Sequence, residues 1–176
     1  MATRNIIAQK QDAGLRKKTR EVTSFNQRLF TLLDDMAETM RSVDGVGLAA
    51  PQVGVLRRVA VVDVGDGLIE LINPILLEAS EEEQDGVEGC LSVPDIHENV
   101  TRKSQITIRY QDENFVEQTK TFEGMPARVI QHEYDHLLGK TFIEHLTSLK
   151  KTLLKRKLND ISTGKTTPFY KTKPTK

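Results

Sequence analysis

The spacing of apolar residues changes several times along the chain, and each spacing predicts a different element. The helical period, with apolar residues three or four positions apart, occurs in three segments: 24–41, 126–138 and 148–158. Ser24 and Gln27 resemble a capping box at the start of the first segment. In the second, Pro126 suits the first helical turn and Gly139 suits the position just beyond the end.

Other segments are rich in β-branched residues or alternate apolar and polar residues, which is typical of strands. These segments are 57–64, 68–74, 106–111 and 115–123. We expect Pro74 to end the second segment and the last two segments to form a hairpin. Residues 1–22 and 45–54 show no clear period, and residues 161–176 are predicted to be a frayed tail. The acidic segment 78–86 is expected to be a solvated loop; a metal site there is the less favoured alternative.

Length and composition restrict the class of protein. A chain of 176 residues with 38% hydrophobic and 28% charged residues fits one globular domain. No apolar run approaches the ~20 residues that span a bilayer, and the first twenty residues lack a signal-peptide core. The single cysteine, Cys90, cannot form an intramolecular disulfide. We therefore expect a cytoplasmic protein without a membrane partner.

Charge is unevenly distributed, although the formal net charge is zero. Residues 148–176 contain nine Lys or Arg and one Asp. This segment is therefore predicted to be a basic helix and tail, distinct from the preceding residues 1–147. It can be a solvated extension, or it can dock on nucleic acid or another acidic surface.

The segment QHEYDHLLG, residues 131–139, places His132 and His136 four positions apart on a predicted helix. Four residues are about one helical turn, so both imidazoles leave the same face and can bind one metal ion. Glu133 is then free to handle the proton of a bound water, as in HExxH sites. The alternative is that both histidines are ordinary, partly buried residues bonded to the backbone.

A catalytic metal site usually has three protein ligands and one position for water, so a third ligand must come from elsewhere. Cys90 is the favoured candidate because two histidines lack a partner, although a lone cysteine is more often a small buried hydrophobe. The competing candidates are Asp135, Glu144 and His145. Asp135 points about 100° away from His136 on the helix, and His145 follows the glycine that ends it.

Three segments together resemble the motifs of the peptide deformylase family, in the same order and at similar spacing: GVGLAAPQ (45–52), EGCLS (88–92) and QHEYDHLLG (131–139). The likeness extends to LINPILL (71–77) and covers about residues 15–147. It implies an α+β fold of antiparallel strands packed around a central helix that carries HExxH, with a C-terminal helix. It also implies a metal-dependent hydrolase that removes the N-formyl group from the N-terminal methionine of newly synthesised proteins.

The resemblance also implies roles for individual residues. It makes Cys90, His132 and His136 the metal ligands, Glu133 the general acid and base, and Gln52 and the Leu91 backbone N–H the donors to the formyl oxygen. Such donors are needed because negative charge develops on that oxygen. One thiolate and two imidazoles can hold one divalent ion per chain, such as iron(II), zinc, nickel or cobalt, and the resemblance implies iron(II).

The implied substrates are N-formylmethionyl nascent peptides, whose methionine side chain needs an apolar slot. The residues expected to bind them are Gly45, Gly47, Gly89, His97, Met125, Arg128 and Val129. Gly86 and Arg128 stand where we expect apolar residues in many relatives, and His97 stands where some relatives have an arginine. The Arg128 stem can line the slot while its charged head reaches water.

The basic C-terminal helix resembles a tail with which some members dock on the ribosome, so the ribosome is a candidate partner. Packing of this helix on its own domain is the alternative. Two other functions remain open. A zinc peptidase of the HExxH type would leave EGCLS and GVGLAAPQ without roles, and a structural metal module on the ribosome would usually need four protein ligands.

Overall fold

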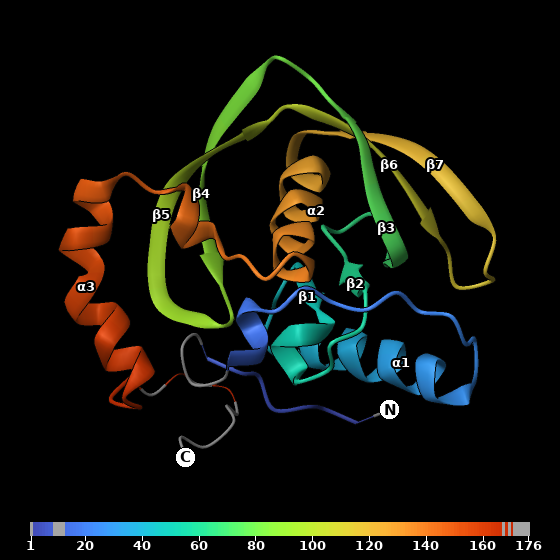
Figure 1. Ribbon diagram of the computed structural model, residues 1–176, viewed down its shortest axis with the longest axis horizontal. Coiled ribbons are helices and arrows are strands. Elements are labelled where there is room, and N and C mark those ends of the chain that lie inside the picture. The colour runs from blue at the N-terminus through green and yellow to red at the C-terminus, as the bar shows by residue number, and fades with distance from the viewer. Residues whose placement is uncertain (1, 9–12, 167, 169, 171–176) are drawn as a thin grey trace.

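The computed structural model describes residues 2–8, 13–166, 168 and 170, and these residues combine helices with antiparallel strands (Figure 1). The α-helices are α1 (Gln27–Ser42), α2 (Gly124–Leu137) and α3 (Ser148–Ser162). Short 3-10 helices cover Ala13–Arg16, Ala50–Val53 and Phe142–His145. The strands are β1 (Gly47–Ala49), β2 (Val59–Val62), β3 (Ile69–Ala79), β4 (Glu83–Cys90), β5 (Val93–Lys103), β6 (Gln105–Gln111) and β7 (Glu117–Glu123).

Two sheets surround α2, which stands in the centre of Figure 1. The larger sheet has the order β1-β2-β3-β6-β7, and β4 and β5 form a separate two-stranded sheet. Every pairing between these strands is antiparallel. Ala127, Val129 and Ile130 of α2 pack into one hydrophobic cluster with residues of β2, β3 and β6. The predicted α+β class and the β6–β7 hairpin are therefore confirmed.

Helix α1 begins three residues later than predicted and has a different cap. The N-cap is Asn26, whose side chain accepts hydrogen bonds from the backbone N–H groups of Arg28 and Leu29. The predicted Ser24 and Gln27 capping box is therefore wrong. An Asn side chain one residue before the helix satisfies the same free N–H groups. The buried face of the helix, which includes Leu33 and Met40, follows the predicted stripe.

The acidic segment 78–86 is not the predicted loop. Strand β3 continues to Ala79 and β4 already begins at Glu83, where it pairs with Lys103 of β5. Strand β4 exposes alternate side chains and buries little apolar surface, so its sequence lacks the usual strand signal. Pro74 does not end β3 either. A register shift between Ile72 and Ile75 accommodates the proline, which has no N–H for the ladder.

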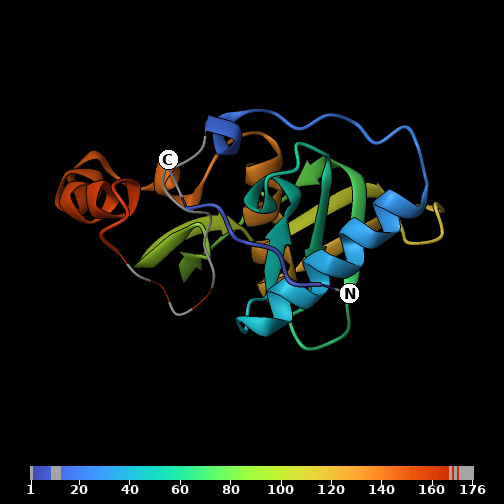
Figure 2. The same cartoon turned by 90° about the horizontal axis from the view of Figure 1, so that it is seen from below.

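Helix α3 packs on the outer face of the β4–β5 hairpin, and Figure 2 shows it at the end of the molecule remote from α1. Leu154, Leu158 and Ile161 join a hydrophobic cluster with residues of β5. Leu149 and Leu153 are 69% and 73% exposed on its other side. The helix continues to Ser162, whereas much of the predicted frayed tail, at 167, 169 and 171–176, lies outside the described residues.

The predicted division of the chain at residue 148 stays a prediction. Over the described ranges, no helix combines the length and the apolar composition needed to cross a membrane.

Candidate metal centre and substrate cleft

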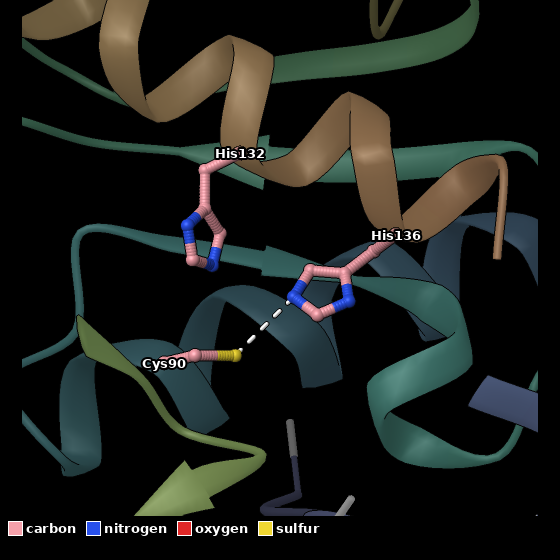
Figure 3. Close-up of side chains that lie close together, drawn as sticks. All are labelled: Cys90, His132 and His136. Atoms are coloured by element: carbon pink, nitrogen blue, oxygen red, sulfur yellow. Dashed lines mark hydrogen bonds between the residues drawn. The ribbon is translucent and has the colours of Figure 1, made fainter. Parts of the chain in front are cut away.

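Three side chains able to bind a metal converge where the end of β4 meets α2 (Figure 3). Cys90 is the last residue of β4, and His132 and His136 project from α2 one turn apart. One ligand atom from each side chain lies within 4.8 Å of the other two. Cys90 Sγ is 3.3 Å from His136 Nε2. The structure thus brings together the three residues that the sequence proposed as ligands.

Glu88 orients the first histidine. Its Oε1 lies 2.8 Å from His132 Nδ1. Burial opposes ionisation of Glu88, but Arg102 and His132 outweigh it and hold the pKa of this carboxyl far below its usual range. Because an ionised carboxylate can only accept, His132 Nδ1 carries the proton and donates it. His132 Nε2 is then left for the centre, which is the usual arrangement of a metal-binding histidine and its carboxylate partner.

The electrostatics of the centre favour a cation. Burial alone would raise the pKa of the Cys90 thiol, but His136 and His132 lower this pKa to about 5, so Cys90 is a thiolate at neutral pH. Burial would lower the pKa of His132, but Cys90 and Glu88 raise it well above its ordinary value. The protein therefore stabilises positive charge at this point, and a divalent ion can replace the proton.

Two buried polar atoms at the centre lack hydrogen-bond partners among the described residues: Glu133 Oε2 and His136 Nδ1. An unpaired buried carboxylate oxygen is costly, so its position beside three metal donors fits a site that also holds water or substrate. Burial raises the pKa of Glu133 to about 7, although His132 and His136 oppose this rise. Glu133 can therefore exchange a proton near neutral pH.

Gln52 enters from the 3-10 helix after β1 with a fixed amide orientation. Its Oε1 accepts from the Ala49 backbone N–H at 2.9 Å, so its NH₂ group faces the centre. Gln52 Nε2 lies 3.2 Å from Ser92 Oγ and 3.6 Å from Cys90 Sγ. Leu91 follows Cys90 directly and lines the same cleft. Both residues predicted to supply oxyanion donors therefore lie beside the three candidate ligands.

A cleft of about 400 Å³ opens onto Cys90 and Glu133. All the residues predicted to bind substrate line it: Gly45, Gly47, Gly89, His97, Met125, Arg128 and Val129. Both Met125 and Val129 belong to α2; Met125 is 57% exposed, whereas Val129 is buried. Gly47 lies so close to the carboxylate that a Cβ there would be 2.4 Å from Glu133 Oε1.

The charged head of Arg128 does not reach water, so that part of the sequence interpretation is wrong. Its side chain is 5% exposed, and Nη1 donates to Glu88 Oε2 at 2.7 Å. The head turns inward because a carboxylate and several backbone carbonyls of the β4–β5 hairpin lie within its reach. Two of the competing ligands are also elsewhere: Asp135 pairs with Arg102 at 2.6 Å and with His145 at 2.8 Å.

Sequence reasoning assigned no role to Glu88, Arg102 or Tyr170. Arg102 of β5 binds both oxygens of Glu88, and the Tyr170 hydroxyl donates to the Leu91 carbonyl oxygen at 2.6 Å at the edge of the cleft. Glu88 lies within the EGCLS segment, two residues before Cys90 on the same strand face. Recognition of β4 as a strand would have pointed to it.

Comparison with known proteins shows similarity over most of the chain. The family model for polypeptide deformylase matches residues 4–152. A peptide deformylase of Thermotoga neapolitana is 46% identical over 153 residues, which are 86% of this chain and 92% of that one. A peptide deformylase structure from Legionella pneumophila superposes with a TM-score of 0.86 at 37% identity, covering 95% of this chain and 100% of that chain. One from Ehrlichia chaffeensis, in complex with actinonin, gives 0.87 at 34% identity, covering 95% of this chain and 100% of that chain.

Proposed function

The chain belongs to the peptide deformylase family, and from this premise we propose which of its residues carry the reaction. The enzyme removes the N-formyl group from the N-terminal methionine of newly made proteins, releasing formate and a free amine. The observation that carries our proposal is the buried Glu133 carboxylate, which lies in the cleft beside the Cys90, His132 and His136 cluster.

We propose Cys90, His132 and His136 as the ligands of the one metal ion that this metal-dependent family needs. An ion held there supplies Lewis acidity and makes water a nucleophile at neutral pH. A thiolate with two imidazoles suits iron(II), which we propose as the native metal, and also zinc, nickel or cobalt. Metal analysis of protein purified without oxygen from its native source tests this choice.

We propose that Glu133 accepts a proton from the attacking water and delivers it to the departing amine. A carboxyl whose pKa lies near neutrality can do both. As the water oxygen bonds to the formyl carbon, negative charge develops on the formyl oxygen. The Gln52 amide and the Leu91 backbone N–H are our proposed donors to that oxygen, since fixed donors lower such a barrier by several kcal/mol.

Formate release from formyl-Met-Ala-Ser tests the assignment of Glu133. We expect Glu133→Gln to lower turnover by about 10²–10⁴-fold, the usual contribution of general acid–base catalysis, while the metal remains bound. The exposed Glu144, a competing ligand candidate, provides the matched control Glu144→Gln. Loss of metal from Glu133→Gln, or loss of activity in Glu144→Gln, would contradict the proposal.

We also propose that the cleft residues from Gly45 to Val129 hold the methionine side chain and the peptide backbone, and that the enzyme works in the cytoplasm, where nascent chains emerge. The family's activity and the lining of the cleft support this proposal. A series of formylated tripeptides that differ in the first side chain tests it. Equal kcat/KM for formyl-Met and formyl-Asp peptides would refute an apolar slot.

Helix α3 is our proposed ribosome-docking element, distinct from the catalytic part at 1–147. Its outward side carries the exposed Leu149 and Leu153 among basic residues that include Lys155 and Arg156. Deleting the helix would uncover the apolar cluster that it shares with β5, so charge reversal is the better test.

We expect the double variant Lys155→Glu, Arg156→Glu to sediment with ribosomes several-fold less at physiological salt, with unchanged kcat/KM on the tripeptide. Lys17→Glu, Lys18→Glu reverses two exposed charges elsewhere and is the matched control. Equal sedimentation of both variants would refute docking through α3.

A further inference from the structure

The Arg128 side chain extends from α2 to the β4–β5 hairpin and donates several hydrogen bonds to it. Besides its 2.7 Å bond to Glu88, Nη1 donates to the Val100 carbonyl oxygen at 2.8 Å. Nη2 donates to the Gln84 carbonyl oxygen at 2.7 Å. The guanidinium therefore joins one helix to both strands of the hairpin.

Gly86 provides the space for this guanidinium. A Cβ added at Gly86 would lie 3.0 Å from Arg128 Cζ, Nε and Nη2, which is closer than ordinary van der Waals contact. The charged group thus packs against the backbone of Gly86, and a Cβ there would require it to shift. Gly86 and Arg128, the two residues that stand where apolar residues were expected, therefore pack against each other.

The metal donors are divided between the two elements that Arg128 joins. Cys90 lies on β4, whereas His132 and His136 lie on α2, so the distance from the thiolate to the imidazoles depends on how the hairpin sits against the helix. Arg102 of the hairpin donates a hydrogen bond to Asp135 on α2. Arg128, two turns earlier on α2, donates one to Glu88 of the hairpin. Together the two arginines hold the hairpin at two levels of the helix.

Both arginines donate hydrogen bonds to the carboxylate of Glu88, which orients His132. Glu88 Oε2 accepts from Arg128 Nη1 and from Arg102 Nε, and Oε1 accepts from Arg102 Nη2 and His132 Nδ1. We propose that Arg128, lying on Gly86, is a positioning residue of the metal centre. It acts through Glu88 on the His132 ring and through the hairpin on Cys90. This inference rests on the proposed set of ligands.

The test is the rate at which cobalt(II)-loaded protein loses its ion to excess chelator, followed by thiolate-to-cobalt absorption. We expect Arg128→Met to release cobalt about tenfold faster, the lower end of the range for partners of metal ligands. Arg109→Met removes an exposed guanidinium on β6 and should match the wild type. An unchanged rate in Arg128→Met would overturn the proposal.

Two further variants separate positioning from filling of space. Arg128→Lys keeps a charge that can reach Glu88, so its release rate should fall between those of the wild type and Arg128→Met. The double variant Gly86→Ala, Arg128→Met refills part of the volume without restoring the hydrogen bonds, so fast release should persist. A release rate in Arg128→Lys equal to that of Arg128→Met, or a wild-type rate in the double variant, would refute positioning through Glu88.

Cys90→Ser tests the ligand set itself; because this variant has no thiolate, its cobalt release is followed by the absorption of the cobalt–chelator complex. If Cys90→Ser holds cobalt as the wild type does, the ligand set is wrong. If Cys90→Ser loses cobalt and Arg128→Met does not, only the role of Arg128 is wrong.

Discussion

Gly47 gives the sharpest prediction, because the smallest possible side chain there collides with the proposed acid and base. In Gly47→Ala the new Cβ would lie 2.4 Å from Glu133 Oε1 and 2.8 Å from Val129 Cγ1. The carboxylate would have to move by about 1 Å to reach ordinary contact distance. Misplacement of a reacting group by about 1 Å can cost on the order of 10²-fold in rate.

We therefore expect kcat/KM for formyl-Met-Ala-Ser to fall about 100-fold in Gly47→Ala, equivalent to about 2.7 kcal/mol of transition-state stabilisation. The cobalt content should remain that of the wild type, because the clash involves Glu133 and Val129 and not the three ligands. Gly65→Ala is a suitable control, since a Cβ there meets nothing within 4 Å and the residue lies in a remote turn, although its φ of 109° adds strain.

A double-mutant cycle identifies the cause of the loss. Glu133→Asp shortens the carboxylate side chain by one methylene, so Gly47→Ala should cost much less in that background than in the wild type. An equal loss in both backgrounds would mean that β1 itself moves. Wild-type kcat/KM in Gly47→Ala would refute the claim that backbone approach at Gly47 fixes Glu133.

Three further predictions concern metal binding and stability. Cys90→Ser should lower cobalt affinity by at least tenfold in a chelator competition, because it removes the thiolate. Leu154→Ala should cost about 2–4 kcal/mol in urea unfolding, whereas the 73% exposed Leu153→Ala should change stability by less than about 0.5 kcal/mol. Burial opposes ionisation of Asp35, but hydrogen bonds from Ala2 and Arg4 outweigh it and lower its pKa. The stability that this carboxylate contributes is present above the unfolded pKa of about 4 and is lost as pH falls through the folded value. Asp35→Asn should therefore be destabilised at pH 7, and its difference from the wild type should shrink as pH falls below the unfolded pKa of about 4, as urea unfolding at several pH values will show.

The sequence predicted the parts of the site that depend on local spacing. The HExxH residues were predictable because a 3.6-residue period, Pro126 and Gly139 delimit α2 closely. The choice of Cys90 as third ligand followed from counting donors, and the structure brings it to the two histidines.

The hairpin was not predictable in the same way, since a strand that buries little apolar surface gives no period-2 signal. As a consequence, Glu88 and Arg102 were missed. The inward turn of Arg128 depends on the absent side chain of Gly86, which is distant in sequence. Only long-range packing reveals such a pair.

The proposed metal donors are divided between the hairpin and α2, and this division would link the lifetime of the protein to the metal supply. Cys90 and His136 are separated by 46 positions along the chain, so the unfolded polypeptide offers no comparable binding site. An ion that binds only the native state stabilises it by RT ln(1 + [M]/Kd), about 2.7 kcal/mol at a hundred times Kd. Metal starvation would thus increase the unfolded fraction on which proteases act, and the amount of enzyme in a cell would follow the available metal.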